Sequence, residues 1–223
     1  VELRKKHALP QNYFLASARF VEKKNLARLI HAYAAYRARS SITGNGRSPT
    51  ETWELVLLGD GPLRPELCRQ IAALGLKEHV FMRGFKQYAE LPVFYGLARA
   101  FIHASTTEQW GLVVNEAMAS GLPVLVSNRC GCAMDLVREA STGFTFDPLN
   151  TEQMADLMSR CSKTPDDLVD MGKAAQILIS SWGLDRFAGG LMQAVEKSVE
   201  SPPPKASLAN RLLIKLLLLH IGQ

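Results

Sequence analysis

The chain has 223 residues, enough for one large domain or two small ones. Hydrophobic residues make up 47% of it and charged residues 21%, which are ordinary proportions for a soluble globular protein. The net charge of +5 comes from scattered lysines and arginines without an aromatic-interleaved basic stripe, so nucleic-acid binding is not expected. An anionic small molecule or an acidic membrane surface accounts for this surplus equally well.

Short apolar strands alternate with amphipathic helices along most of the sequence. We predict strands at Tyr13–Ala18, Glu54–Gly59, His79–Met82, Ala100–His103, Pro123–Ser127 and Gly143–Phe146. We predict the intervening helices near Leu26–Ala38, Leu63–Leu74, Leu91–Leu97, Leu112–Ser120 and Met134–Ala140. Such alternation favours an α/β fold, in which a parallel sheet carries helices on both faces. Ligands of these sheets bind at the carboxyl ends of the strands, where all the motifs described below fall.

The region after the sheet contains three further helical patterns, at Thr151–Cys161, Pro165–Ser180 and Leu184–Val199. The proline-rich run at 201–205 then indicates a stiff linker. An apolar helix is expected over Leu208–Ile221, and at 1.5 Å per residue it would extend roughly 20 Å, too short to span a bilayer. It either lies in a membrane interface or docks on another domain or subunit. We therefore divide the chain into a domain at 1–200 and a linker with an apolar helix at 201–223.

The stretch from Glu108 to Glu116 is the most informative part of the sequence. A polar segment passes through Gly111 into a helical pattern, so a helix N-terminus is expected near Gly111, with Glu108 just before it and Glu116 about one turn inside. The free amides and positive dipole end of such a helix suit a diphosphate. Carboxylates would repel a neighbouring phosphate unless they accept hydrogen bonds from the hydroxyls of the sugar attached to that phosphate. This combination indicates a nucleotide-sugar site.

Three other strand ends carry candidate binding residues. Arg19 and Lys24 follow the first strand and could clamp a diphosphate, the arginine through its fork and the lysine as a point charge. Gly59 and Gly61 flank an aspartate after the second strand and allow close backbone approach. Arg83 follows the third strand, where a backbone edge could recognise a nucleobase. We assign no role to the histidine at the fourth strand end, and the four cysteines lack the spacing of a metal site.

Together these residues resemble the C-terminal, donor-binding half of GT-B glycosyltransferases, in particular the retaining family 4, also called glycosyl transferases group 1. The resemblance runs from about Asn12 to Val199. Its motifs are the segments 18–25 (ARFVEKKN), 57–62 (LLGDGP), 80–85 (VFMRGF), 108–124 (EQWGLVVNEAMASGLPV) and 143–148 (GFTFDP). It implies a Rossmann-like GT-B domain.

The resemblance also implies the roles of individual residues. The positions matching Arg19 and Lys24 bind the donor diphosphate, the position matching Glu108 meets the sugar hydroxyls, and that matching Glu116 holds the ribose. The backbone of Trp110, Gly111 and Leu112 touches the phosphate or sugar. Catalysis would be metal-independent and without a cofactor, because cations and the helix dipole stabilise the leaving diphosphate of a UDP-, GDP- or ADP-linked donor.

The function implied is transfer of a hexosyl group, with retention of configuration, to a polysaccharide or lipid-linked glycan. The family's N-terminal half binds the acceptor, and no counterpart of it occurs in this sequence, so we expect a separate polypeptide or a missing segment to supply it. Without that half the chain would bind a nucleotide sugar and transfer poorly. The alternative is a non-catalytic nucleotide-sugar-binding subunit or sensor. We expect a cytoplasmic protein, with peripheral contact at the inner membrane face through the C-terminal helix.

Overall fold

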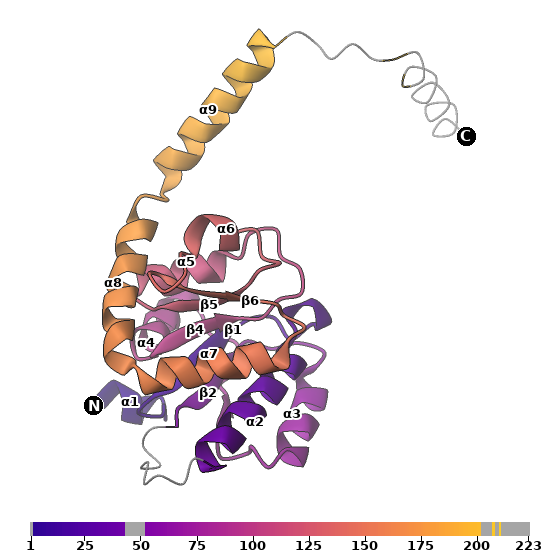
Figure 1. Cartoon of the computed structure of the whole chain (residues 1–223), viewed down its shortest axis with the longest axis vertical. Coiled ribbons are helices and arrows are strands. Elements are labelled where there is room, and N and C mark those ends of the chain that lie inside the picture. Colours follow the sequence, from indigo (N-terminus) through magenta and orange to yellow (C-terminus); the bar gives the residue numbers. More distant parts are fainter. Residues whose placement is uncertain (1, 43–51, 202–206, 208–209, 211–223) are drawn as a thin grey trace. The chain divides into compact units, whose positions relative to one another are not determined.

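Six parallel strands form a single sheet in the computed structural model of the protein, which describes residues 2–42, 52–201, 207 and 210 (Figure 1). The strands are β1 (Tyr13–Ser17), β2 (Glu54–Leu58), β3 (Val80–Met82), β4 (Ala100–His103), β5 (Val124–Ser127) and β6 (Gly143–Phe146). Their order in the sheet is β3-β2-β1-β4-β5-β6. The predicted Rossmann-like parallel sheet is thereby confirmed, and each strand lies within one residue of its predicted bounds.

The order reverses direction between β1 and β4, which pair side by side although they are far apart in sequence. The chain builds outward from β1 to β3, then crosses back to β4 and continues to β6. Exit loops on the two sides of such a reversal diverge, and ligands of doubly wound folds bind in the crevice between them. A ligand site is therefore expected between the loops that follow β1 and β4.

Helices cover both faces of the sheet. Those within residues 2–181 are, in chain order, α1 (Glu2–Lys6), η1 (Glu22–Lys24), α2 (Leu26–Ile42), α3 (Arg64–Ala73), η3 (Tyr88–Glu90), α4 (Leu91–Gly96), α5 (Leu112–Ala119), α6 (Ala133–Leu136), α7 (Thr151–Lys163) and α8 (Pro165–Ser180). A further helix, α9 (Leu184–Glu200), belongs to the separate unit described below. On one face α2 packs beside α3 and α7, and on the other α5 packs beside α8 and against β4 and β5 (Figure 1).

The core follows from the alternation of side chains along each strand. In β1, Phe14 and Ala16 join the cluster beneath α2 and α7, whereas Tyr13 and Leu15 are equally buried but lie outside that cluster. Because helices cover both faces, the strands read as continuous apolar runs rather than as alternating patterns. This explains why strand positions were predictable from hydrophobicity.

Helix α6 is shorter than the predicted Met134–Ala140, because the chain becomes extended at Val137. The buried hydroxyl of Thr142 donates to the carbonyl of Leu136 and accepts from the amide of Arg138. These are backbone groups that a longer helix would have used. The pattern of apolar residues could not show that the Thr142 hydroxyl would compete for these backbone groups.

The chain divides into two compact units, residues 1–181 and 182–223. Within the second unit α9 is amphipathic, and its apolar residues are exposed; they include Leu184, Phe187, Leu191 and Val195. The predicted linker and most of the predicted apolar C-terminal helix lie outside the described residues. Within the part of the chain that the structure describes, no helix has the length and apolar character needed to cross a membrane.

Candidate donor site at the carboxyl edge of the sheet

The ammonium group of Lys24 and the carboxylate of Glu108 meet across the reversal point of the sheet. Lys24 ends η1 in the loop after β1, and Glu108 lies in the loop after β4; the two form a direct ion pair. Both side chains are largely buried, with 16% and 15% of their surface exposed. The second oxygen of Glu108 lies 3.7 Å from the ammonium of Lys23. The structure thus brings together two residues that were predicted to bind neighbouring parts of one donor.

This pair sets the charge state of the Glu108 carboxyl. Partial burial works against its charged form, but the hydrogen bond from Lys24 and the positive charges of Lys24 and Lys23 outweigh that effect. The pKa of Glu108 therefore lies below its ordinary value, and the group is an anion at neutral pH. A charged carboxylate is a strong acceptor for sugar hydroxyls.

Asn25 fixes the loop that carries Lys24, a role that was not predicted from the sequence. Its backbone is left-handed, with φ of 58°, and its buried side-chain amide donates to the carbonyls of Ala104, at 3.0 Å, and Pro148, at 2.8 Å. The amide of Thr106 also donates to the carbonyl of Lys23, at 2.8 Å. These bonds join the exit loops of β1, β4 and β6. The sequence signal was an asparagine, which tolerates the left-handed region, directly before a helix start.

The Glu108 loop is held on its other side by residues 128–132. Glu108 forms a parallel bridge with Cys130, and the amides of Gly131 and Cys132 donate to the carbonyls of Glu108, at 3.0 Å, and Trp110, at 3.2 Å. At Gly131 an added Cβ would lie 1.9 Å from the carbonyl oxygen of Gln109, so only glycine permits this approach. Burial raises the pKa of the thiols of Cys130 to about 11 and of Cys132 to about 12, so both are neutral packing groups.

His103, to which no role was assigned, lies directly beneath the ion pair. The imidazole is 3% exposed, and its Nε2 lies 3.8 Å from Glu108 Oε2 and 3.3 Å from the hydroxyl oxygen of Ser105. Burial, together with the charge of Lys24, lowers the pKa of His103 to about 4, and Glu108 only partly offsets this. The imidazole is therefore neutral at pH 7. Nothing in its sequence position distinguished it from an ordinary core histidine.

Helix α5 begins at Leu112, as predicted, with Gly111 as its N-cap. Gly111 has a φ of 107°, which favours glycine, and no side chain caps the first turn. The uncapped amides and the positive end of the helix dipole are thus open to an anion. Trp110 donates from its indole nitrogen to Asn115 at 3.0 Å, and the side chain of Leu112 is exposed.

Glu116 lies on α5 and is held by an aromatic residue from α4. The Tyr95 hydroxyl donates to Glu116 Oε2 at 3.0 Å. The ring of Tyr95 is itself buried and stacks on Phe101. Glu116 was predicted from the sequence but its buried partner was not, because the two residues are 21 positions apart and meet only in the folded chain.

Gly59 and Gly61 bring the end of β2 against the end of β1. An added Cβ at Gly59, where φ is 119°, would lie 1.9 Å from the carbonyl oxygen of Ala18, and one at Gly61 would lie 2.6 Å from that of Phe20. The amide of Phe20 donates to the carbonyl of Asp60 at 2.8 Å. The close backbone approach expected of these glycines is therefore an approach between the loops that follow β1 and β2.

Arg19 and Arg83 stand in different environments. Arg19 is exposed, and no hydrogen bond or ion pair joins its guanidinium to the rest of the described chain, so it is available to a ligand. Arg83 instead donates to the carbonyl of Ala8 and lies 5.1 Å above the ring of Phe81. Its side chain braces the segment before β1 in this structure.

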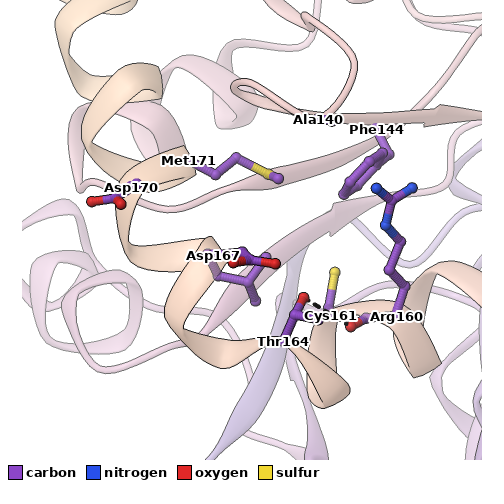
Figure 2. Close-up of a pocket in the computed structure, with 9 residues that line it drawn as sticks. Ala140, Phe144, Arg160, Cys161, Thr164, Asp167, Asp170 and Met171 are labelled. Atoms are coloured by element: carbon purple, nitrogen blue, oxygen red, sulfur yellow. Dashed lines mark hydrogen bonds between the residues drawn. The ribbon is translucent and has the colours of Figure 1, made fainter.

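A separate cavity of about 360 Å³ opens among β6, α7 and α8 (Figure 2). There the guanidinium of Arg160 lies 4.4 Å from the ring centroid of Phe144, near Asp167 and Met171. None of the predicted site residues lines this cavity. Among residues 2–42 and 52–201, no group of three histidine, cysteine or acidic side chains is arranged to hold a metal ion.

Comparison with known families decides the identity of the domain. The family described as glycosyl transferases group 1 matches residues 2–177. The chain belongs to this family. Among its curated relatives, the group 1 glycosyltransferase domain is 30% identical to an alpha-D-kanosaminyltransferase of Streptomyces kanamyceticus, over 84% of this chain and 47% of the relative.

Solved structures agree with this assignment of the fold. Alr3699/HepE of Anabaena, solved in complex with UDP, has a TM-score of 0.73 and 24% identity, over 88% of this chain and 52% of that one. The C-terminal domain of the group 1 glycosyl transferase LpcC from Francisella tularensis has a TM-score of 0.69 and 19% identity, over 81% of this chain and 90% of that one. The chain spans about half the length of the curated relatives, whose matched shares are 47%, 40% and 49%. The GT-B fold expected from the sequence is confirmed.

Proposed function

We propose that this group 1 glycosyltransferase domain binds a nucleotide-sugar donor and activates its diphosphate for departure. The observation that carries the proposal is the Lys24–Glu108 pair beside the uncapped N-terminus of α5. Glu108 accepts hydrogen bonds from the sugar, Glu116 from the ribose, and Lys24 and Arg19 contact the diphosphate. Amides of residues 110–112 complete the phosphate site.

The chemistry follows from this charge arrangement. When the bond between the anomeric carbon and the diphosphate breaks, negative charge develops on the leaving oxygen. Fixed cations and helix amides already aimed at that oxygen stabilise it without reorganisation. The acceptor hydroxyl forms the new bond on the face from which the diphosphate leaves, and its proton passes to the departing phosphate. Configuration is retained, and the transferred group is a hexosyl unit.

The acceptor in this proposal is a polysaccharide or lipid-linked glycan, bound by a second domain that faces the carboxyl edge of the sheet. The names of two matched relatives refer to glycolipids: an alpha-monoglucosyldiacylglycerol synthase of Acholeplasma laidlawii and a GDP-mannose-dependent alpha-(1-6)-phosphatidylinositol monomannoside mannosyltransferase of Mycobacterium tuberculosis. We place the protein in the cytoplasm, in contact with the inner membrane face through residues 208–221. Truncation after residue 201 should abolish its co-sedimentation with anionic lipid vesicles, and unchanged co-sedimentation would refute that contact.

Calorimetric titration with UDP, GDP and ADP tests donor binding. At least one should bind, and Glu116→Ala should weaken that binding about tenfold, as expected for lost hydrogen bonds to a charged group. Glu78→Ala is the matched control, because Glu78 is an exposed carboxylate at the amino end of β3, on the opposite edge of the sheet. If none of the three nucleotides binds, the proposed function is wrong. A chain that binds but never transfers, even beside an acceptor domain, would instead be a sensor or subunit.

A further inference from the structure

A buried stack of three rings runs beneath the candidate site. The Tyr95 and Phe101 rings lie 5.6 Å apart at an angle of 28°, and those of Phe101 and His103 lie 6.4 Å apart at 13°. All three side chains are almost wholly buried, at 1%, 0% and 3% exposure. Packing of this density locks side-chain rotamers, so the stack is a rigid support.

The two ends of the stack reach the two glutamates of the site. At one end the Tyr95 hydroxyl donates to Glu116 Oε2 at 3.0 Å, and at the other His103 Nε2 lies 3.8 Å from Glu108 Oε2. Within the described chain, Tyr95 is the only hydrogen-bond donor to the Glu116 carboxylate. One oxygen of Glu116 thus accepts from a fixed group, and the two lone pairs of Oε1 remain for other donors.

The Tyr95 phenol is suited to this task because it stays protonated. Its burial, together with the neighbouring charge of Glu116, raises the pKa of Tyr95 far above the ordinary value for tyrosine. A permanent donor holds the carboxylate plane in one orientation. A free glutamate side chain would sample several rotamers, and ordering it on ligand binding costs free energy.

We propose that Tyr95 is a positioning residue, which orients Glu116 so that its carboxylate accepts hydrogen bonds from the two ribose hydroxyls of the donor. The inference rests on the ribose role of Glu116 in the proposed function. Tyr95 itself touches no ligand, and it acts through the orientation of Glu116. Selectivity for a ribonucleotide over a nucleotide whose sugar lacks these hydroxyls then depends on a buried group that does not contact the ligand.

The test compares affinities for two nucleotides. The probe is whichever of UDP, GDP and ADP binds the wild-type chain most tightly, measured by calorimetry beside its 2′,3′-dideoxy counterpart. Tyr95→Phe should reduce the affinity ratio of the two by about tenfold, chiefly through weaker ribonucleotide binding. A merely structural contribution of Tyr95 would weaken both nucleotides alike and leave the ratio unchanged.

Tyr13→Phe is the matched control. Tyr13 is equally buried, and its hydroxyl donates to the carbonyl of Phe94 at 2.6 Å rather than to a carboxylate. This variant should lose stability but keep the wild-type ratio. In a Glu116→Ala background, Tyr95→Phe should have no further effect on the ratio, because the group that it orients is gone.

The outcomes separate this inference from the proposed function. If the wild-type chain does not distinguish the two nucleotides, Glu116 has no ribose role. That result overturns both this part of the proposed function and the positioning role of Tyr95. If wild type distinguishes them and Tyr95→Phe does so equally well, the positioning role alone is overturned. Should Tyr95→Phe fail to fold, Glu116→Asp serves instead, because its shorter side chain draws the carboxylate away from the phenol; a full wild-type ratio in that variant also overturns the inference.

Discussion

Lys24 and Glu108 lie 84 positions apart in sequence, yet their charged groups are in direct contact at the point where the sheet reverses its strand order. Each was predicted to bind a different part of a donor, the lysine its diphosphate and the glutamate its sugar. Their pairing means that the two functions share one electrostatic unit. Removal of either charge should therefore lower both the stability of the fold and the affinity for the ligand.

The first prediction concerns stability. Lys24→Ala leaves the largely buried Glu108 carboxylate without its main partner, and we expect a loss of about 1–3 kcal/mol in the free energy of unfolding. Lys23→Ala is the control, because the Lys23 side chain is 53% exposed and contributes less than about 1 kcal/mol. Urea denaturation at neutral pH measures both. Equal losses in the two variants would contradict the inferred strength of the pair.

The second prediction concerns the diphosphate. Combined Arg19→Ala and Lys24→Ala substitutions should lower the preference for a nucleoside diphosphate over the bare nucleoside by about 10- to 100-fold, since charge-assisted hydrogen bonds are lost. Calorimetry with UDP and uridine provides the measurement. Lys77→Ala with Arg99→Ala makes the same charge change at the amino ends of β3 and β4 and should leave the preference intact. An unaltered preference in the first pair would refute the diphosphate clamp.

The third prediction concerns pH. Because the folded pKa of His103 is about 4, below the ordinary 6.5, the unfolded chain binds a proton at this position between these values and the folded chain does not. Stability should thus fall as pH decreases from about 6.5 to 4, by up to about 3 kcal/mol from this group. Glu108, whose pKa is lowered, loses its contribution over a more acidic range, as pH falls below the unfolded value of a glutamate.

His103→Leu should flatten the part of the stability profile between pH 4 and 6.5 that comes from this imidazole. The exposed His31 is the control, and His31→Asn should keep the wild-type profile. Thermal unfolding across this range of pH provides the comparison. A profile for His103→Leu that is as steep as wild type would show that the imidazole titrates alike in both states.

The fourth prediction concerns the loop beneath Glu108. In Gly131→Ala the added methyl meets the carbonyl of Gln109, and either loop must shift. We expect a loss of about 1–3 kcal/mol in stability, together with weaker nucleotide binding. At Gly189 in α9 an added Cβ meets nothing within 4 Å, so Gly189→Ala should preserve binding. Wild-type affinity in Gly131→Ala would mean that the bridge to Cys130 does not position Glu108.

The fold was predictable because β1, β2, β4 and β5 are buried at nearly every position and are therefore mostly apolar along their whole length. The glycines and charged residues at the strand ends then placed Arg19, Lys24, Glu108 and Glu116 at one edge of the sheet. Both Tyr95 and His103 escaped prediction, since an aromatic or imidazole side chain in an apolar segment looks the same whether it supports a site or only fills space. Their neighbours are set by tertiary packing.

Two other features depend on local contacts that were not predicted. The early end of α6 depends on the Thr142 hydroxyl, which competes for helix backbone groups from a position outside the helix. The contact of Arg83 with Ala8 depends on the segment before β1, for which no structure was predicted. The pattern at 80–85 marked the end of β3 correctly but did not determine where a long, flexible side chain would point.

The exit loops of β4 and β5 pair again after their strands have ended, through Glu108 and Cys130. Residues 106–111 and 128–132 therefore form one structural unit, although they are separate in the sequence. A chimera that imports the first piece from another transferase, in order to change the sugar, would have to import the second with it. To change donor preference in this fold, both segments should therefore be exchanged together. Transplants of one loop alone should give distorted, inactive hybrids.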